Sequence, residues 1–196
     1  MEDIKISVPD SVYPPLEDSQ LLADVALKEC SGRILEVGCG SGFVSITISK
    51  FKPDTKIICV DINSEAVKAA KKNSAVNGVK LKIFESDLFE NVDVGSDFDW
   101  ILFNPPYLPT SEAEKIDGGL NFAFDGGESG FDTVFRFLER AKDYLKKDGK
   151  VLLVVSTAQD LLVLNQKICD CGYLFEVMAQ ESFFFEKIYV YKLTQM

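Results

Sequence analysis

The sequence predicts an α/β fold in which a mostly parallel β-sheet is covered by helices on both faces. From residue 33 onward, short apolar runs rich in β-branched residues alternate with amphipathic helical stretches. A glycine-rich turn directly after the first apolar run is the usual place for a nucleotide-type ligand loop. The 196 residues, 46% of them hydrophobic, suffice for one sizeable core, so we expect a single domain over residues 1–196.

Each strand of the expected sheet is a short apolar run bounded by charged or turn-forming residues. We expect strands at residues 33–37, 56–61, 81–85, 98–103 and 150–156. Helices should lie between and after them, at residues 43–50, 64–76, 131–145 and 158–171. Two final apolar runs, at residues 173–178 and 187–193, leave no room for a crossover helix, so we expect them to pair antiparallel at the end of the sheet.

The expected helix at residues 131–145 has an apolar stripe, since its apolar residues recur at spacings of three and four. We expect this helix to end in Lys146-Lys147-Asp148-Gly149, because lysines suit the negative end of the helix dipole and glycine suits the exit from a helix. Residues 108–130 before it form the one long irregular segment, which is polar and glycine-rich. Loops of that length in compact domains are usually functional or mobile.

Composition excludes several kinds of site. The chain has no histidine, which removes serine triads, cysteine–histidine pairs, histidine metal sites and histidine general bases. Its five cysteines form no CxxC pair, so we expect no metal site and no disulfide framework, as in a reducing compartment. The apolar stretch at residues 21–26 is interrupted by Asp24 and followed by Lys28, and no signal-peptide leader precedes it. We therefore expect a cytoplasmic protein without a membrane segment.

The formal net charge of −10 argues against nucleic acid as a partner, because a field of that sign repels phosphate backbones. Lysines do gather at residues 68–82 and 142–150. We interpret them as solvated helix faces and strand ends, although a local basic patch could override the total charge.

The glycine-rich turn follows the strand at residues 33–37 and leads directly into a helix. Its glycines Gly38, Gly40 and Gly42 let a ligand approach the backbone and the helix N-terminus closely. The loop lacks the Lys-Ser/Thr of a P-loop and the Gly-x-Gly-x-x-Gly spacing of a dinucleotide loop. Asp61 ends the next strand, where a carboxylate can accept hydrogen bonds from both ribose hydroxyls. Because a carboxylate at Glu36 would repel a pyrophosphate but favour a cation, the motif indicates S-adenosylmethionine rather than NAD.

These motifs resemble those of the class I methyltransferases. The resemblance implies a Rossmann-like, mostly parallel seven-stranded sheet of order 3-2-1-4-5-7-6, with the last strand antiparallel. It also implies that Ile62, Asp87 and Leu88 contact the cofactor, with Asp87 accepting from the adenine amino group and the Leu88 backbone alongside. Taken alone, Asp87 would also suit a turn or a helix cap. The product of such a reaction is S-adenosylhomocysteine.

The segment Asn104-Pro105-Pro106-Tyr107 follows the strand at residues 98–103, at the carboxyl edge where open α/β sheets bind ligands. Pro105 and Pro106 fix φ and remove two donors, which leaves a rigid turn with outward-facing carbonyls. The nitrogen of an amide or aromatic amine attacks a methyl sulfonium poorly, since its lone pair is delocalised. The Asn104 side-chain oxygen and the Pro105 carbonyl can each accept one N–H, which relocalises that pair and stabilises the developing positive charge. Tyr107 can stack on the planar group, and no strong base is needed.

The Asn-Pro-Pro-Tyr motif leaves the substrate open, because adenine-N6 and guanine-N2 methyltransferases share it with the glutamine methyltransferases of release factors. Tyr13, Pro15, Asp18 and Ser19 lie in a segment that resembles the opening of the short archaeal and eukaryotic release-factor enzymes. That resemblance implies that residues 1–30 cover the cofactor. The glycine-rich loop at residues 122–130 is similar to a loop of the same family, and no separate helical domain precedes the cofactor strand.

The chain is therefore identified as a member of the HemK-like protein glutamine methyltransferases. The resemblance implies N5-methylation of the glutamine in the Gly-Gly-Gln motif of a class 1 release factor. Some members work with a small zinc-binding activator subunit that adds a strand to the sheet edge, and whether this chain does so stays open. Three alternatives also remain: methylation of adenine-N6 or guanine-N2 in RNA or DNA, methylation of a protein lysine, and a non-enzymatic cofactor-binding scaffold.

Overall fold

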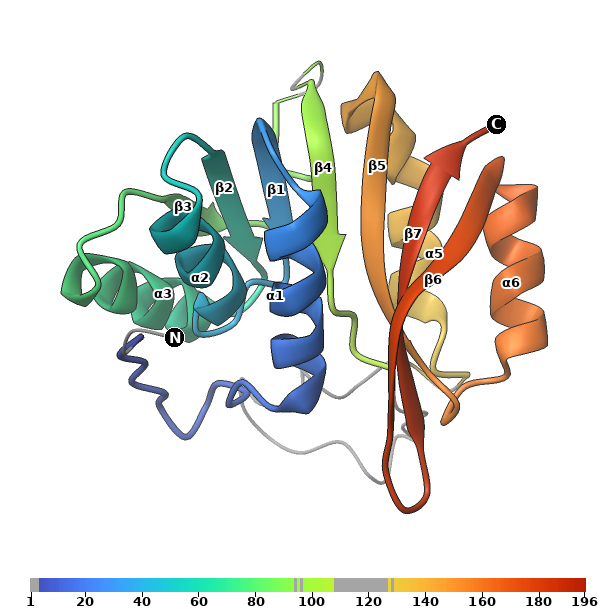
Figure 1. The fold of residues 1–196 in the computed structure, drawn as a ribbon, viewed down its shortest axis with the longest axis horizontal. Helices are drawn as coiled ribbons and strands as arrows, with labels where there is room; N and C mark the ends of the chain where they lie inside the picture. The colour runs from blue at the N-terminus through green and yellow to red at the C-terminus, as the bar shows by residue number, and fades with distance from the viewer. Residues whose placement is uncertain (1–3, 94, 96, 108–126, 128) are drawn as a thin grey trace.

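The computed structural model describes residues 4–93, 95, 97–107, 127 and 129–196, which form a seven-stranded sheet between two layers of helices (Figure 1). The strands are β1 (Arg33–Val37), β2 (Lys56–Asp61), β3 (Lys82–Glu85), β4 (Phe98–Phe103), β5 (Leu145–Ser156), β6 (Tyr173–Ser182) and β7 (Lys187–Gln195). The helices are α1 (Glu17–Glu29), α2 (Phe43–Phe51), α3 (Ser64–Val76), α5 (Asp132–Arg140), the 3₁₀ turn η2 (Ala141–Tyr144) and α6 (Leu161–Asp170). The long segment at residues 108–126, and with it most of the glycine-rich motif at residues 122–130, lies outside the described residues.

The strands are ordered β3-β2-β1-β4-β5-β7-β6, which confirms the order implied by the class I resemblance. β1 pairs parallel with β2 and β4, β3 pairs parallel with β2, and β5 pairs parallel with β4. β7 runs antiparallel to both β5 and β6, so the expected antiparallel pairing of the two last runs is also confirmed. Because the five parallel strands point the same way, their carboxyl ends meet at one edge of the sheet (Figure 1).

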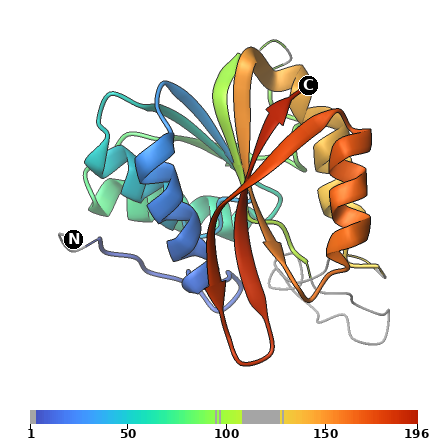
Figure 2. The same cartoon turned by 45° about the vertical axis from the view of Figure 1, so that its right-hand side comes forward.

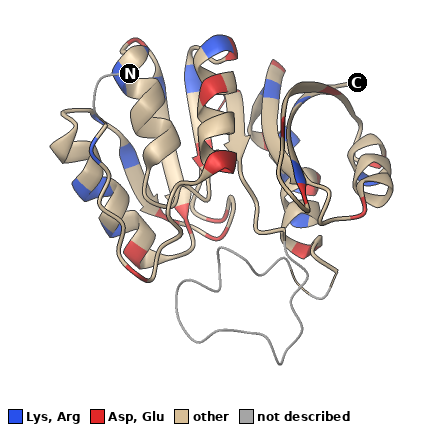
Figure 3. Cartoon of the chain, turned by 60° about the horizontal axis from the view of Figure 1, so that its bottom comes forward, with Lys and Arg blue, Asp and Glu red and all other residues tan. Residues whose placement is uncertain are grey.

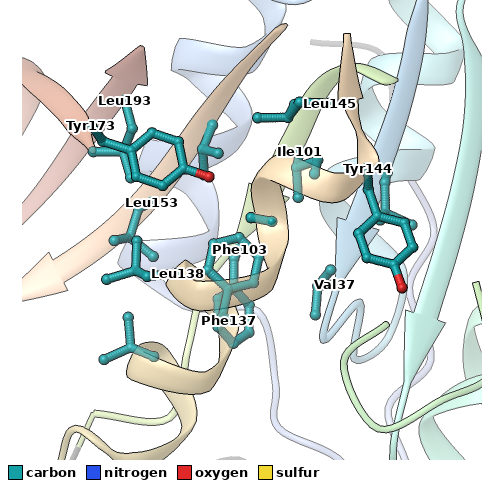
Figure 4. Close-up of a cluster of buried hydrophobic side chains, with 14 of the residues drawn as sticks. Val37, Ile101, Phe103, Phe137, Leu138, Tyr144, Leu145, Leu153, Tyr173 and Leu193 are labelled. Atoms are coloured by element: carbon teal, nitrogen blue, oxygen red, sulfur yellow. The ribbon is translucent and has the colours of Figure 1, made fainter. Parts of the chain in front are cut away.

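The sheet is buried on both faces, and alternate residues of one strand pack into different cores. Ile34 of β1 belongs to the core beneath α1, α2 and α3, whereas its neighbour Leu35 belongs to the core beneath α5, η2 and α6. The second core is rich in aromatic rings, shown in Figure 4. Phe137 of α5 lies with its ring centroid 4.5 Å from that of Phe103 at the end of β4. This packing fixes the strand end from which residues 104–107 continue.

The prediction that a helix extends to residue 145 and ends in Lys146-Lys147-Asp148-Gly149 is wrong. α5 stops at Arg140, η2 follows, and β5 already begins at Leu145. The β4–β5 register shifts at this point, so residues 146–149 form an irregular step within the strand pair. Lys146 Nζ lies 2.6 Å from Asp99 Oδ1 of β4. Lys146, which was expected at the end of a helix, is thus paired with a residue of the neighbouring strand. The sequence around Lys146 could not predict that contact.

Two further helices differ from the expectation. α1 has no counterpart among the expected helices, although Leu22, Val25 and Ala26 recur at helical spacing and are buried. α6 begins at Leu161 instead of residue 158. Its N-cap is Asp160, whose carboxylate accepts the backbone N–H of Leu162 at 2.9 Å.

The β6–β7 hairpin extends beyond the carboxyl ends of the parallel strands, as Figures 1 and 2 show from two directions. The N-terminal residues before α1 pass the same end of the sheet. In the part of the chain that the structure describes, no helix is both long and apolar enough to span a membrane.

Candidate active site

A cavity of about 560 Å³ opens at the carboxyl ends of the parallel strands. Such a volume accommodates a cofactor-sized molecule. The residues predicted to bind the cofactor or the substrate that line it are Tyr13, Pro15, Asp18, Ser19, Glu36, Gly38, Gly40, Asp61, Ile62, Asp87, Leu88, Asn104, Pro105, Pro106 and Tyr107. Segments far apart in the sequence thus meet at one site, as the motifs predicted.

The glycine-rich turn has a left-handed backbone at Gly38, Gly40 and Gly42, with φ of 66°, 52° and 82°. A methyl group at Gly40 would meet no atom of the described residues within 4 Å, which leaves room beside the backbone. Gly42 differs, because it does not line the cavity. A methyl group there would lie 3.1 Å from the Cβ of Ala70 in α3. Its bare Cα therefore allows α2 and α3 to approach each other, and the structure gives it no contact with the cavity.

Asp61 at the end of β2 is fixed by the turn that it faces. The Gly40 N–H donates to its Oδ2 at 2.8 Å, and the Asn63 N–H donates to its Oδ1 at 2.9 Å. Burial raises the pKa of Asp61, while these two hydrogen bonds oppose the rise. The carboxylate is therefore held in one orientation at the cavity wall, with lone pairs left for a further donor.

Glu36 in β1 lies deeper, with 4% of its surface exposed. Its Oε2 accepts the Ser45 N–H at 3.1 Å and also the Ser45 hydroxyl. Burial raises the pKa of Glu36 to about 8, and the hydrogen bonds from Ser45 only partly offset that rise. A cation entering the cavity would relieve the cost of ionising this carboxyl group.

Asp87, expected at the adenine, forms an ion pair that the sequence did not indicate. Arg136 Nη2 of α5 lies 2.7 Å from Asp87 Oδ2, and both residues line the cavity. The neighbouring Leu88 has a left-handed backbone, with φ of 47°. The pairing joins residues 49 positions apart at the wall of the cavity.

Asn104 is oriented by Asp18 of α1, 86 residues earlier in the chain. The Asn104 Nδ2 donates to Asp18 Oδ2 at 2.9 Å. A carboxylate can only accept, so this contact decides which end of the amide carries the NH₂ group. Asp18 itself is held by Ser19, whose N–H donates to Asp18 Oδ1 at 2.6 Å. The orientation of Asn104 therefore depends on the start of α1.

The other end of the same amide is unsatisfied. Asn104 Oδ1 is buried and has no hydrogen-bond partner among the residues that the structure describes. A buried acceptor without a donor costs about 1–3 kcal/mol. Such an atom is an acceptor available for an N–H that the protein does not supply.

Tyr107 and Tyr13 each hydrogen-bond a carboxylate at the cavity, that of Glu186 and that of Asp18. Burial raises the pKa of the Tyr107 phenol above its usual value, and the charge and hydrogen bond of Glu186 raise it further. The pKa of Tyr13 is raised by burial and then by Asp18. Sequence reasoning missed Glu186, which directly precedes β7 and also accepts the Ser156 hydroxyl. The only feature of the sequence that could have indicated a role for Glu186 is its position next to the end of an expected strand.

The cavity is acidic overall. The charged side chains that line it are Asp18, Glu36, Asp61, Asp87, Glu186 and Arg136. Figure 3 looks onto this end of the molecule and shows acidic residues gathered around the strand ends. Among the described residues, no cluster of histidine, cysteine, aspartate or glutamate could hold a metal ion. The electrostatics favour a ligand with net positive charge and disfavour phosphates.

The chain is similar to several known methyltransferases. The family model described as the methyltransferase small domain matches residues 17–117. A relative from Methanocaldococcus jannaschii, provisionally named a protein N5-glutamine methyltransferase, is 45% identical over 190 residues, which cover 97% of this chain and 95% of that protein. The release factor glutamine methyltransferase of Geobacter sulfurreducens is 29% identical over 175 residues, which cover 84% of this chain and 61% of that enzyme.

Solved structures show the same fold at low sequence identity. The Mtq2–Trm112 complex of E. cuniculi, described as responsible for methylation of the termination factor eRF1, contains a chain with a TM-score of 0.72 and 20% identity. The match covers 95% of this chain and 99% of that one. A methyltransferase from Pyrococcus furiosus has a TM-score of 0.71 and 18% identity, with 98% and 90% of the two chains covered.

Proposed function

The chain belongs to the methyltransferase small domain family and, within it, to the protein N5-glutamine methyltransferases, and from that premise we propose that it methylates a class 1 peptide release factor. The acceptor is the side-chain nitrogen N5 of the glutamine in the Gly-Gly-Gln motif. The observation that carries the proposal is the buried Oδ1 of Asn104 in the Asn-Pro-Pro-Tyr turn, for which the described part of the chain offers no hydrogen-bond donor. The release factor glutamine methyltransferases among the relatives, and the eRF1-methylating complex with the same fold, support this substrate.

The methyl donor in this proposal is S-adenosylmethionine, and the residues present fit it. Glu36 is a buried carboxyl group that a neighbouring cation would help to ionise, and Asp61 retains lone pairs for ribose hydroxyls. Gly40 leaves space beside its backbone. The other residues that would hold the donor are Tyr13, Pro15, Asp18, Ser19, Gly38, Ile62, Asp87 and Leu88. When bound, the donor supplies an electrophilic methyl group.

The residues of the turn prepare the acceptor nitrogen. A glutamine amide has two N–H groups, and in this proposal they donate to Asn104 Oδ1 and to the Pro105 carbonyl. When both N–H groups are bound in this way, the nitrogen lone pair would point towards the methyl group. The two acceptors would also stabilise the positive charge that grows on the nitrogen. Asp18 holds the Asn104 amide in the orientation this requires. Tyr107 restricts the planar amide to one angle, and the proton released after transfer passes to water.

The charge of the cavity weighs against the alternative substrates. Carboxylates at Asp18 and Glu186 would repel the phosphates of RNA or DNA. The same carboxylates would keep a lysine ammonium protonated, since nearby negative charge raises its pKa, and a protonated amine has no lone pair to donate. A neutral glutamine amide meets neither obstacle.

The test is methyl transfer from labelled S-adenosylmethionine to purified class 1 release factor, run beside a release factor whose Gly-Gly-Gln glutamine is replaced by glutamate. We expect label only in the first, removed by protease and resistant to nuclease. Transfer to RNA or DNA without transfer to the release factor would favour the nucleic-acid alternative. Each reaction should be run with and without a small zinc-binding activator subunit.

An activator of that type would bind at β3 in this proposal. β3 is an edge of the sheet, so within the described residues one side of its backbone has no neighbouring strand, and Lys82 is exposed on it. A small partner that adds a strand there should lose affinity for a Lys82→Pro variant. The solved Mtq2–Trm112 complex pairs a chain of the same fold with a second protein, which supports a partner of this kind. Normal binding of the partner by that variant would exclude the β3 edge. The expected cytoplasmic location agrees with a translation substrate and stays a prediction.

A further inference from the structure

The turn of the β6–β7 hairpin carries three consecutive phenylalanines, Phe183, Phe184 and Phe185, here called the aromatic tip. Phe184 and Phe185 are each 93% exposed, and their rings meet edge to face with centroids 4.6 Å apart. Burying one phenylalanine side chain contributes about 1.5–3 kcal/mol, so two adjacent exposed rings forgo a large stabilisation. Neighbouring exposed rings of this kind are typical of a surface that another molecule covers.

The aromatic tip is carried by a hydrogen-bonded hairpin. β6 and β7 stay paired up to Ser182 and Lys187, and the Phe183 N–H donates to the Glu186 carbonyl at 2.7 Å. The Thr157 N–H donates to the Lys187 carbonyl at 2.9 Å, which anchors the hairpin to the end of β5. The backbone that presents the rings is therefore hydrogen-bonded up to the turn. Figures 1 and 2 show this hairpin projecting on the side of the strand carboxyl ends.

The aromatic tip directly precedes a residue of the active-site cavity. Glu186, the residue after Phe185, lines the cavity and hydrogen-bonds Tyr107 of the Asn-Pro-Pro-Tyr turn. The side chain of Glu186 also accepts the Ser156 hydroxyl at the end of β5. A large molecule whose glutamine enters the cavity past Tyr107 would thus lie close to the hairpin turn that carries the rings.

We propose that Phe184 and Phe185 are a docking contact for the folded protein that carries the substrate glutamine. The inference rests on the proposed function and extends it from the reacting amide to the body of the substrate. The rings are flanked by the carboxylates of Glu181 and Glu186 and by the ammonium group of Lys187, beside a cavity lined mainly by acidic side chains, on a chain of net charge −10. The complementary partner surface is an apolar hollow bordered by lysine or arginine. Nucleic acid bases can also stack on aromatic rings, but the flanking carboxylates oppose the phosphates that accompany them.

The test compares wild type with the double variant Phe184→Ser/Phe185→Ser, using release factor as substrate. Neither ring is packed in the core, so the variant should fold with the thermal midpoint of wild type. We expect KM for the release factor to rise roughly tenfold or more, as for an aromatic hot spot, while kcat and the Kd for S-adenosylmethionine stay unchanged. The matched control is Leu174→Ser, which removes an apolar side chain, 57% exposed, from the opposite end of β6. It should leave KM unchanged.

An unchanged KM in the double variant would overturn the docking contact and leave the proposed function standing. Sedimentation adds a second readout. A wild-type dimer that the double variant abolishes, with KM unchanged, would assign the aromatic tip to self-association instead. Failure of wild type to methylate the release factor at all would overturn the proposed function, and the docking contact with it.

Discussion

The two halves of the active-site cavity are built differently. The half around Glu36, Gly40 and Asp61, here called the donor half, is the one proposed to hold the methyl donor. Its acidic side chains are fixed by hydrogen bonds from nearby residues, as Asp61 is by Gly40 and Asn63. The half formed by the turn at residues 104–107, here called the acceptor half, is the one proposed to hold the glutamine that accepts the methyl group. There Asn104 is oriented by Asp18 from α1, and the Oδ1 atom of Asn104 has no hydrogen-bond partner among the described residues. The carboxylate of Asp61 in the donor half is therefore already hydrogen-bonded before a ligand binds. In the acceptor half, Asn104 Oδ1 can still accept a hydrogen bond from an N–H of the substrate. Substitutions in the first should change affinity for the donor, and substitutions in the second should change turnover.

The largest effect is expected for Asn104→Ala. Loss of a preorganised acceptor that acts on the developing charge should lower kcat about 10²–10³-fold. The Kd for S-adenosylmethionine should change little, because Asp61 and Glu36 are untouched. Steady-state methyl transfer and calorimetric titration measure the two quantities. A parallel loss of donor affinity would erase the distinction between the halves.

Asp61→Ala should have the opposite profile. Removing a carboxylate that accepts hydrogen bonds from the donor should weaken S-adenosylmethionine binding about tenfold to a hundredfold, with kcat near wild type at saturating donor. The control is Asp160→Ala, which removes the N-cap of α6 away from the cavity and should leave donor affinity unchanged. Should Asp61→Ala lower kcat with normal affinity, Asp61 would belong to the acceptor half.

Donor affinity should also depend on pH through Glu36, whose pKa is raised to about 8. A cation binds the ionised carboxylate better than the neutral acid, so binding releases a proton below that pH. Affinity for S-adenosylmethionine should then rise with pH between 6 and 8, by up to about tenfold per unit. Titrations across this range with wild type and Glu36→Gln provide the check. An equal slope in the variant would assign the titration to another group.

The smallest effect on activity is expected for Gly42→Ala, since Gly42 packs against Ala70 outside the cavity. The strained φ of 82° should lower the free energy of unfolding by about 1–2 kcal/mol, measured in denaturant, with donor affinity little changed. Gly40→Ala is the comparison, because it has a similar left-handed φ but its methyl group would enter open space at the cavity. That variant should weaken donor binding; equal donor affinity in both variants would contradict the different positions of the two glycines.

The sequence predicted the elements marked by local composition better than those that depend on distant contacts. The strands β1, β2 and β4 lie where their apolar runs placed them, because a strand buried on both faces is marked by its own composition. The glycine turn and Asp61 are close in sequence and were found together. The 3₁₀ turn η2 and the early start of β5 were missed, since they go with contacts between distant residues, the pairing of Leu145 with Phe98 and of Lys146 with Asp99.

Partners brought together from distant segments were missed in the same way. Arg136 reaches Asp87 only after α5 has packed on the sheet, and Glu186 reaches the cavity only through the hairpin. Neither contact leaves a periodicity or motif in the sequence. Asp18 was expected near the donor, yet its hydrogen bond to Asn104 also makes it part of the acceptor half. Long-range side-chain contacts of this kind require the folded chain.

In the proposed reaction the enzyme methylates a glutamine amide that Asn104 and the turn after it hold in place. Identifying the atom of the substrate that carries the methyl group tests this most directly. Tandem mass spectrometry of a class 1 release factor, after incubation with the enzyme and S-adenosylmethionine, identifies the modified atom. We expect one methyl group on the side-chain nitrogen of the Gly-Gly-Gln glutamine with wild type, and almost none with Asn104→Ala. A methyl group on a lysine, or equal methylation by the Asn104→Ala variant, would contradict the claim.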